Sequence, residues 1–244
     1  MILDIFKDAL EYSAQDWKAL IKLGIISILG FLILPIFLYF GYSYRVTKIS
    51  VEGMIGGGEP LPDFSDIIQM FVDGLKVFLV YLVYGLIVAV IFLVFVAIAG
   101  SIGDAGKIVL FIGVIVTLIV GIFAYLMSMM GVANMAANGD SLSKAFDFKG
   151  LIEIIKSIGI LRLIVAYIGV GLISALIYIL VGIVIMFLFG FLGISGSIIG
   201  LGDAVSGGIF SFGVILSYAV IIFIAGPYIA IMQSRANGLL YNLH

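Results

Sequence analysis

The chain has 244 residues, of which 64% are hydrophobic and only 11% are charged, whereas a soluble domain is about half apolar and about one quarter charged. This composition excludes an ordinary soluble domain and indicates a membrane protein. The formal net charge of −2, without a basic tail, argues against a nucleic-acid partner, and the lack of cysteine excludes disulfides, thiol catalysis and thiolate metal sites.

The first 21 residues are predicted to form an amphipathic helix that lies in the membrane interface. In residues 2–21, apolar side chains recur at steps of three and four, and charged or amide side chains occupy the opposite face. Trp17, the only tryptophan, would anchor this helix at headgroup level. The mixed charges do not match a cleavable signal peptide. A regulatory helix that leaves the membrane is the alternative.

Five stretches without Asp, Glu, Lys, Arg or His predict five membrane-spanning helices. Each is longer than the roughly 20 residues that cross a hydrocarbon core about 30 Å thick. Pro35 lies inside the first stretch and predicts a kink, and the fourth is predicted as one long tilted helix rather than two. The stretches are residues 23–44, 77–103, 108–139, 163–202 and 204–234.

An internal repeat relates successive parts of the chain. Each unit contains a span, a turn that ends in glycine, a short interfacial helix and a second span, and the two interfacial helices are predicted to be capped by Asp63 and Asp147. Glycine-rich turns at 100–105 and 200–204 would make antiparallel hairpins of the spans that they join. A shift of 86 positions aligns Tyr39 with Tyr125, Gly53 with Gly139, Lys76 with Arg162, and Tyr81 with Tyr167.

The predicted fold is therefore an all-α, polytopic transmembrane helix bundle built from a tandem repeat of span, interfacial amphipathic helix and span. Its segments are 1–21, the N-terminal interfacial helix; 22–103, the first repeat with two spans; 104–203, the second repeat with two spans; and 204–244, the final span and C-terminal tail.

The distribution of basic residues predicts the orientation. With five spans, the face that carries the interfacial repeat helices and the C-terminus holds eight of the twelve bases, which favours that face as cytoplasmic. The three lysines of the N-terminal helix would then lie outside, unless the first segment is re-entrant and broken at Pro35. The eight bases are Arg45, Lys48, Lys76, Lys144, Lys149, Lys156, Arg162 and Arg235.

Short motifs, densest over residues 12–90, carry a family resemblance. They are Tyr12–Leu20, Leu34-Pro35, Gly41–Val46, Glu52-Gly53, Leu61–Phe64 and Phe71–Lys76. Together they resemble a family of archaeal polytopic membrane proteins catalogued as domain of unknown function 4013. The resemblance extends over most of the chain and implies a multi-pass archaeal membrane protein. It implies no activity and no functional residue.

No catalytic arrangement can be assembled from the sequence. A charge inside a span costs several kcal/mol and is retained for use, yet the predicted spans contain none, and the single histidine, His244, is the last residue. We expect no enzyme activity and no catalytic, cofactor-binding or metal-binding residues. Five acidic residues lack regular metal-ligand spacing and predict a solvated face: Glu52, Glu59, Asp63, Asp66 and Asp73. The glycines at 56–58 predict a flexible linker rather than a phosphate loop.

Basic residues near the interface are the predicted contacts to lipid or to a partner. Attraction to anionic headgroups contributes about 1 kcal/mol per base. Pairs of small residues, such as Gly171 with Ala175 and Gly213 with Ser217, would permit close helix packing within the bundle, in a homo-oligomer or in a larger membrane complex. The predicted contact residues are Arg45, Lys48, Lys144, Lys149, Lys156 and Arg162.

These features predict a multi-pass protein of the cell membrane that acts without catalysis, as a scaffold or complex subunit, through helix packing and contacts of its interfacial helices. The alternative is a channel or transporter for a neutral or lipidic solute. A conduit requires a continuous polar-lined cavity between the repeats, whereas a scaffold is packed solid and exposes small-residue faces. An enzyme would require convergent polar side chains in a pocket near Asn134, Asn138 or the acidic loop.

Overall fold

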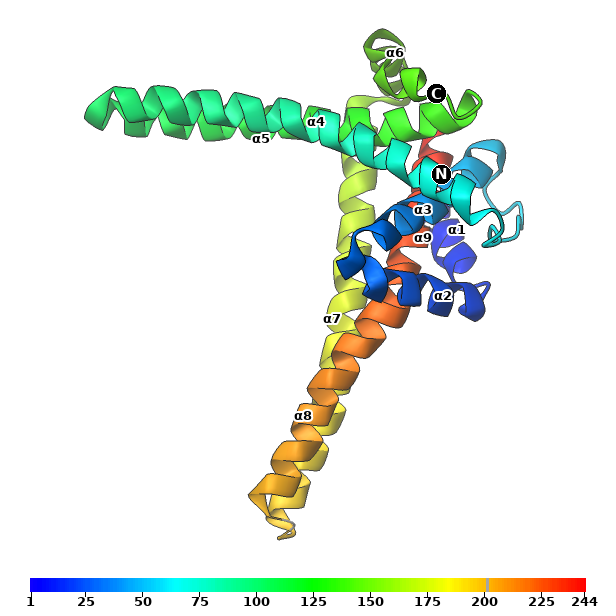
Figure 1. The fold of residues 1–244 in the computed structure, drawn as a ribbon, viewed down its shortest axis with the longest axis vertical. Coiled ribbons are helices and arrows are strands. Elements are labelled where there is room, and N and C mark those ends of the chain that lie inside the picture. Colours follow the sequence, from blue (N-terminus) through cyan, green and yellow to red (C-terminus); the bar gives the residue numbers. More distant parts are fainter. Residues whose placement is uncertain (201) are drawn as a thin grey trace.

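The computed structural model describes residues 1–200 and 202–244, which form helices and turns without a strand. Two long helical hairpins leave a body of shorter helices in different directions (Figure 1). The predicted all-α fold is confirmed. The helices of the body are α1 (Ile2–Ser13), α2 (Trp17–Ile28), α3 (Leu34–Glu52), α6 (Phe148–Ile158) and α9 (Gly226–Tyr241).

The first hairpin pairs α4 (Ile67–Ser101) with α5 (Gly106–Ala137), and a short 3-10 helix, η2 (Gly103–Ala105), joins them. It extends to the left in Figure 1. Both helices consist almost entirely of apolar residues beyond the body. The predicted turn at 100–105 is confirmed.

The second hairpin pairs α7 (Ile160–Ile198) with α8 (Asp203–Val220) and points downward in Figure 1. The prediction of one long helix over 163–202 is confirmed as far as Ile198 by α7, which runs without interruption for 39 residues, while residue 201 lies outside the described residues. A π-helical turn, η4 (Ile221–Ala225), connects α8 to α9. Because α9 returns into the body and is largely buried, the predicted C-terminal tail is part of the core.

Within the described residues, four helices are long and apolar enough to cross a membrane, so the prediction of five spans is wrong. They cover Ile67–Ser101, Gly103–Ala137, Ile160–Ile198 and Ala204–Tyr241, with 35 to 39 residues each. At 1.5 Å per residue, each is about 50 Å or more in length, which exceeds a hydrocarbon core of about 30 Å. Both hairpins leave the body and return to it, and both chain termini lie in the body (Figure 1).

The first predicted span is instead a bent apolar hairpin. Helix α2 ends at Ile28, the 3-10 helix η1 (Leu29–Leu32) follows, and Ile33 adopts a φ of 67° before α3 begins. Pro35 therefore lies in the first turn of a helix, where its missing N–H is tolerated, and does not kink a continuous span. The 12 residues of α2 are about 18 Å long, too short to cross the membrane, which agrees with the re-entrant alternative.

The predicted N-terminal amphipathic helix is two helices rather than one. The chain bends after Ser13, and the Asp16 side chain caps α2 by accepting a hydrogen bond from the Lys18 amide at 2.8 Å. Trp17 is the first residue of α2 and is 59% exposed, where it can contact headgroups. The apolar face of α1 packs into the body through Ile5 and Ala9.

Of the two predicted interfacial helices, the second forms as α6 and the first is part of α4. Asp147 caps α6 by accepting from the Gly150 amide at 3.1 Å, as predicted, and α6 ends at Gly159, whose φ is 99°. In the first unit no separate helix forms, because α4 continues without interruption through Asp73, the position that the shift of 86 aligns with Gly159. The predicted cap at Asp63 is wrong, since the Asp66 side chain accepts from the Gln69 amide at 3.1 Å and caps α4.

Helices α3 and α4 cross so closely that their contact requires glycine. A Cβ on Gly41 would lie 1.8 Å from the Met70 carbonyl oxygen, and a Cβ on Gly74 would lie 1.7 Å from the Phe37 oxygen. Small residues at such crossings let helix backbones approach. This crossing holds the re-entrant hairpin against the base of the first long hairpin.

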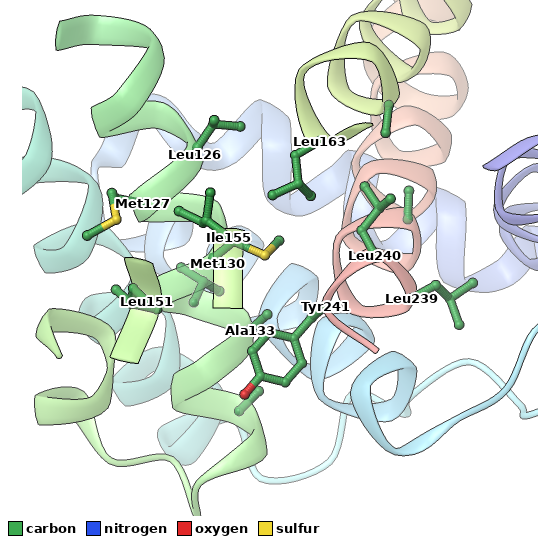
Figure 2. Packing of buried hydrophobic residues seen from close by; sticks show 14 of the residues in the cluster. Leu126, Met127, Met130, Ala133, Leu151, Ile155, Leu163, Leu239, Leu240 and Tyr241 are labelled. Carbon is green, nitrogen blue, oxygen red and sulfur yellow. The ribbon is translucent and has the colours of Figure 1, made fainter. Parts of the chain in front are cut away.

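The core of the body lies where α5, α6, α7 and α9 converge (Figure 2). Met130 and Leu240 are fully buried there. Burial of side chains of this size contributes about 1.5–3 kcal/mol each, so the C-terminal helix is tied firmly to the base of both long hairpins. Figure 2 labels Leu126, Met127, Met130, Ala133, Leu151, Ile155, Leu163, Leu239, Leu240 and Tyr241.

Candidate functional site

Four of the six predicted contact residues form an exposed basic group on one part of the body. They extend from η3 (Leu142–Phe146) through α6 to the start of α7. None of the four forms an ion pair with any residue that the structure describes. We call them the α6 basic group; its members are Lys144, Lys149, Lys156 and Arg162.

Helix α6 also exposes apolar side chains beside these bases. Leu151, Ile155 and Ile158 face the core, whereas Phe148 and Ile152, one turn apart, are 47% and 45% exposed. A helix that combines outward bases with outward apolar side chains suits the headgroup region or a partner surface.

The other two predicted contacts, Arg45 and Lys48, are half-buried and serve the fold. The Arg45 guanidinium donates to the backbone carbonyls of Ser65 at 2.6 Å and Asp66 at 2.9 Å, which fixes the start of α4. Lys48 Nζ lies 2.6 Å from a carboxylate oxygen of Asp140. Arg45 and Lys48 are therefore less available to bind a lipid headgroup than the exposed side chains of the α6 basic group.

Asp140 joins three helices at the end of α5. It adopts a φ of 61°, accepts from the Tyr44 hydroxyl at 2.7 Å and pairs with Lys48, while its carbonyl accepts from Lys76 at 3.0 Å. Burial alone would raise the pKa of the Asp140 carboxyl, but the hydrogen bonds from Lys48 and Tyr44 outweigh burial and hold the pKa below 3.8. The carboxylate therefore stays charged and locks α3 and α4 onto α5.

A buried arginine connects both ends of the chain. Arg235 in α9 has no exposed side-chain surface, its Nε lies 2.6 Å from Asp8 of α1, and one terminal nitrogen lies 2.8 Å from Glu59. Its guanidinium also stacks 4.6 Å from the ring centroid of Tyr12 and donates to the Met54 carbonyl at 3.1 Å. Paired and hydrogen-bonded in this way, the charge is tolerated away from water.

The loop that carries Glu59 is fixed by this cluster. The Gly56 amide donates to Asp8 at 2.6 Å, and the Tyr12 hydroxyl donates to the Pro60 carbonyl at 3.1 Å. Burial raises the pKa of Tyr12 to about 12, so this hydroxyl remains a donor at neutral pH. The loop at 56–60 is therefore anchored to α1 at Gly56 and Pro60, while Gly57 and Gly58 are exposed.

The predicted solvated face is formed only in part: Glu52, Asp63 and Asp66 are exposed, whereas Glu59 and Asp73 are not. Asp73 is 5% exposed and accepts from the Gln69 side chain at 2.7 Å, and Glu59 pairs with Arg235. Asp66 caps α4, and Asp63 accepts from the Ser65 amide. No group of three metal-ligating side chains occurs within the described ranges.

Sequence reasoning missed the Arg235 cluster because nothing local signals it. Arg235 and Asp8 are 227 positions apart, and Arg235 and Glu59 are 176 apart. The two asparagines near which an enzyme would require a polar pocket make hydrogen bonds within the fold: Asn134 donates to the Lys144 carbonyl at 2.8 Å, and Asn138 donates to the Asn134 carbonyl.

A cavity of about 340 Å³ lies where α3, α4, α5 and α9 meet, at the base of the first long hairpin. Its wall combines aromatic and aliphatic side chains with hydroxyl and amide groups and contains no charged side chain. Its volume is within the range of about 300–1,000 Å³ that is typical of small-molecule sites.

The long apolar helices and the charged body define a multi-pass, all-helical protein embedded in a membrane. The chain belongs to the family described as Protein of unknown function (DUF4013), whose model matches residues 25–186. The motif at 12–20, which contributed to the resemblance, precedes the matched region. No curated protein and no solved structure matches the chain.

Proposed function

We propose that this protein is a non-enzymatic scaffold or complex subunit of the cell membrane, which presents two apolar hairpins to lipid and partner helices. The observation that carries the proposal is the isolation of the hairpins. Only 6% of the most apolar 18-residue window of α4, of α5 and of α7 is buried inside the chain. Most of the spanning surface is thus available for contacts outside this chain.

The geometry gives less support to a conduit formed by one copy. Two antiparallel helices cannot enclose a path, and the cavity at the base of the first hairpin is bounded by α3, α4, α5 and α9 rather than extending between the two hairpins. The small-residue pairs have mixed roles. Gly213 packs against Phe189 inside the second hairpin, whereas a Cβ on Gly171 would meet nothing within 4 Å, which leaves that face of α7 open.

The orientation that accompanies this proposal places the body in the cytoplasm. With four crossings and a re-entrant hairpin, the three N-terminal lysines lie on the same side as the other bases of the body, and only Lys107 lies at a hairpin tip. Eleven of the twelve bases (12 minus Lys107) are then on one side, a stronger positive-inside bias than five spans would give. The α6 basic group faces that side and provides charge for anionic headgroups or an acidic partner.

The mass of the particle extracted from its native membrane in a mild detergent tests the proposal, with proteomic identification of co-migrating chains. We expect a defined homo-oligomer or a stoichiometric partner. Neutralisation of the α6 basic group, by K144Q, K149Q, K156Q and R162Q together, should weaken a partner bound at the body, while K18Q with K107Q serves as a charge control. A monomer that conducts a neutral solute across liposomes would overturn the proposal and support the channel or transporter alternative.

A further inference from the structure

The internal repeat brings its tyrosines to one place in the structure. Tyr39 and Tyr125 occupy equivalent positions of the two units, and so do Tyr81 and Tyr167. Tyr39, Tyr81 and Tyr125 line the cavity at the base of the first hairpin. Tyr167 packs edge-on against Tyr125 with ring centroids 5.3 Å apart, and its hydroxyl donates to the side chain of Asn237, which also lines the cavity. Membrane proteins built from repeats commonly place their ligand sites where the repeats meet.

Part of this tyrosine group is held rigidly by the fold. The Tyr39 hydroxyl donates to the Gly226 carbonyl at 3.3 Å, and Asn237 donates to the Met129 carbonyl at 3.0 Å. The Tyr81 ring lies edge-on to Phe40 with centroids 6.2 Å apart. These contacts fix the aromatic walls without a ligand, so the site is preorganised.

Other polar groups of the wall are available for a ligand. The hydroxyls of Tyr81 and Tyr125 make no hydrogen bond with any described residue, and neither do the side-chain hydroxyls of Ser43 and Ser234. A hydroxyl can donate one hydrogen bond and accept others. Four such groups around an apolar cavity can satisfy a ligand that carries hydroxyl or carbonyl oxygens.

The wall also defines the charge of the ligand. It contains no Asp, Glu, Lys, Arg or His, and a charged headgroup placed there would lose its hydration without gaining a counter-ion. An uncharged headgroup loses much less hydration free energy on entering the cavity, and it can replace its hydrogen bonds to water by hydrogen bonds to the hydroxyls of the wall.

The position of the cavity favours a lipid over a free solute. Its wall is mainly apolar, with Val77 and Val132 beside the aromatic rings, and Tyr125 is 47% exposed on the apolar length of α5. About 340 Å³ holds a headgroup but not two acyl chains, which would continue along the exposed faces of α4 and α5.

We propose that this cavity binds the headgroup of an uncharged, hydroxyl-bearing lipid of the diglyceride type, with its acyl chains along the first long hairpin. Tyr81 and Tyr125 are the residues that recognise the headgroup through their hydroxyls. This binding site is independent of the scaffold role, because a scaffold needs only the outer faces of the hairpins.

Native mass spectrometry of the purified full-length protein, titrated with dioleoylglycerol, tests this site. We expect a one-to-one adduct with wild type, and an affinity about tenfold lower when Y81F and Y125F together remove two hydroxyls while keeping both rings. S234L, which fills the cavity, should abolish the adduct. Y218F removes the hydroxyl of a tyrosine that is 64% exposed on α8 and should bind as wild type does.

Several results would overturn the assignment. Equal binding by wild type and the Y81F/Y125F variant would show that the cavity hydroxyls do not recognise the lipid. Equal binding of dioleoylphosphatidylglycerol would show that charge is not excluded, and saturable binding of free glycerol would show a solute site instead. The absence of any adduct would contradict the proposal directly. The Tyr-to-Phe variant retains side-chain volume, so the test remains valid if S234L does not fold.

Discussion

Arg235 is the residue on which the N-terminal helix, the loop at 53–66 and the C-terminal helix converge. Its charge is removed from water and compensated by Asp8 and Glu59. Burial alone would raise the pKa of the Glu59 carboxyl, but hydrogen bonds from backbone amides and from Arg235 hold the pKa below 4.5. Glu59 is therefore charged at neutral pH, and its ion pair and that of Asp8 both depend on the Arg235 guanidinium.

Replacement of Arg235 by methionine should destabilise the protein strongly. Methionine keeps much of the side-chain length but leaves Asp8, which is 8% exposed, as an uncompensated buried charge. Loss of one member of a buried ion pair costs about 3–5 kcal/mol, and we expect a decrease of that size in the free energy of unfolding in detergent. K107M, which removes a base that is 83% exposed at a hairpin tip, should change the same free energy by less than about 0.5 kcal/mol.

A decrease for R235M as small as that for K107M would show that the cluster does not hold the body together. The cluster also marks a limit of sequence reasoning at this scale. Local rules found the helix cap at Asp147, because a cap depends on residues three positions away. They could not pair Arg235 with Asp8, because that contact exists only after the whole body has assembled.

Among the contacts between helices, the crossing of α3 and α4 restricts the sequence most strictly, because it requires glycine at the point of contact. The backbone of each helix occupies the space that a side chain on the other would need, at Gly41 and at Gly74. Gly85 lies in the same helix as Gly74, but a Cβ there would meet nothing within 4 Å. The two kinds of glycine therefore predict opposite effects of the same substitution.

G41A and G74A should each lower the free energy of unfolding by about 1–3 kcal/mol or more, the usual effect of overpacking a well-packed contact. G85A, the matched control, should leave stability unchanged or raise it by about 0.5–1 kcal/mol, because alanine favours a helix more than glycine does. Thermal or denaturant unfolding of the three variants in one detergent compares them. Similar effects at all three positions would mean that the crossing is looser than the structure shows.

The type of an element could be predicted where a long uncharged run contains no proline, as in α7. The first span was predicted wrongly because Pro35 was interpreted as a mid-helix kink, whereas the chain reverses at Ile33 and the proline begins a new helix. The first interfacial helix was predicted as separate because its apolar pattern matches α6. A glycine with positive φ ends α6, whereas the first unit has Asp73 at the position that the shift of 86 aligns with it, and α4 continues through this residue.

At the scale of the whole molecule, the proposed topology has two membrane-spanning hairpins and a re-entrant apolar hairpin between Lys22 and Arg45, with the rest of the body on one side of the membrane. The composition predicted a multi-pass membrane protein, but the number of crossings depends on tertiary contacts of α2 and α3 with the body that no local pattern encodes. The number of crossings also decides the predicted orientation. With four crossings the three N-terminal lysines lie on the same side of the membrane as the other bases of the body, and with five they lie on the opposite side.

Labelling of single cysteines with a membrane-impermeant maleimide tests this topology most directly, because the chain contains no cysteine of its own. The informative variants are K18C before the re-entrant hairpin, S157C in α6 and D104C at the tip of the first long hairpin, each compared in intact cells and in inverted vesicles. We predict that K18C and S157C react only in inverted vesicles and that D104C reacts only in intact cells. Reaction of K18C in intact cells, with S157C still protected there, would show that residues 23–44 cross the membrane and would contradict the four-span account.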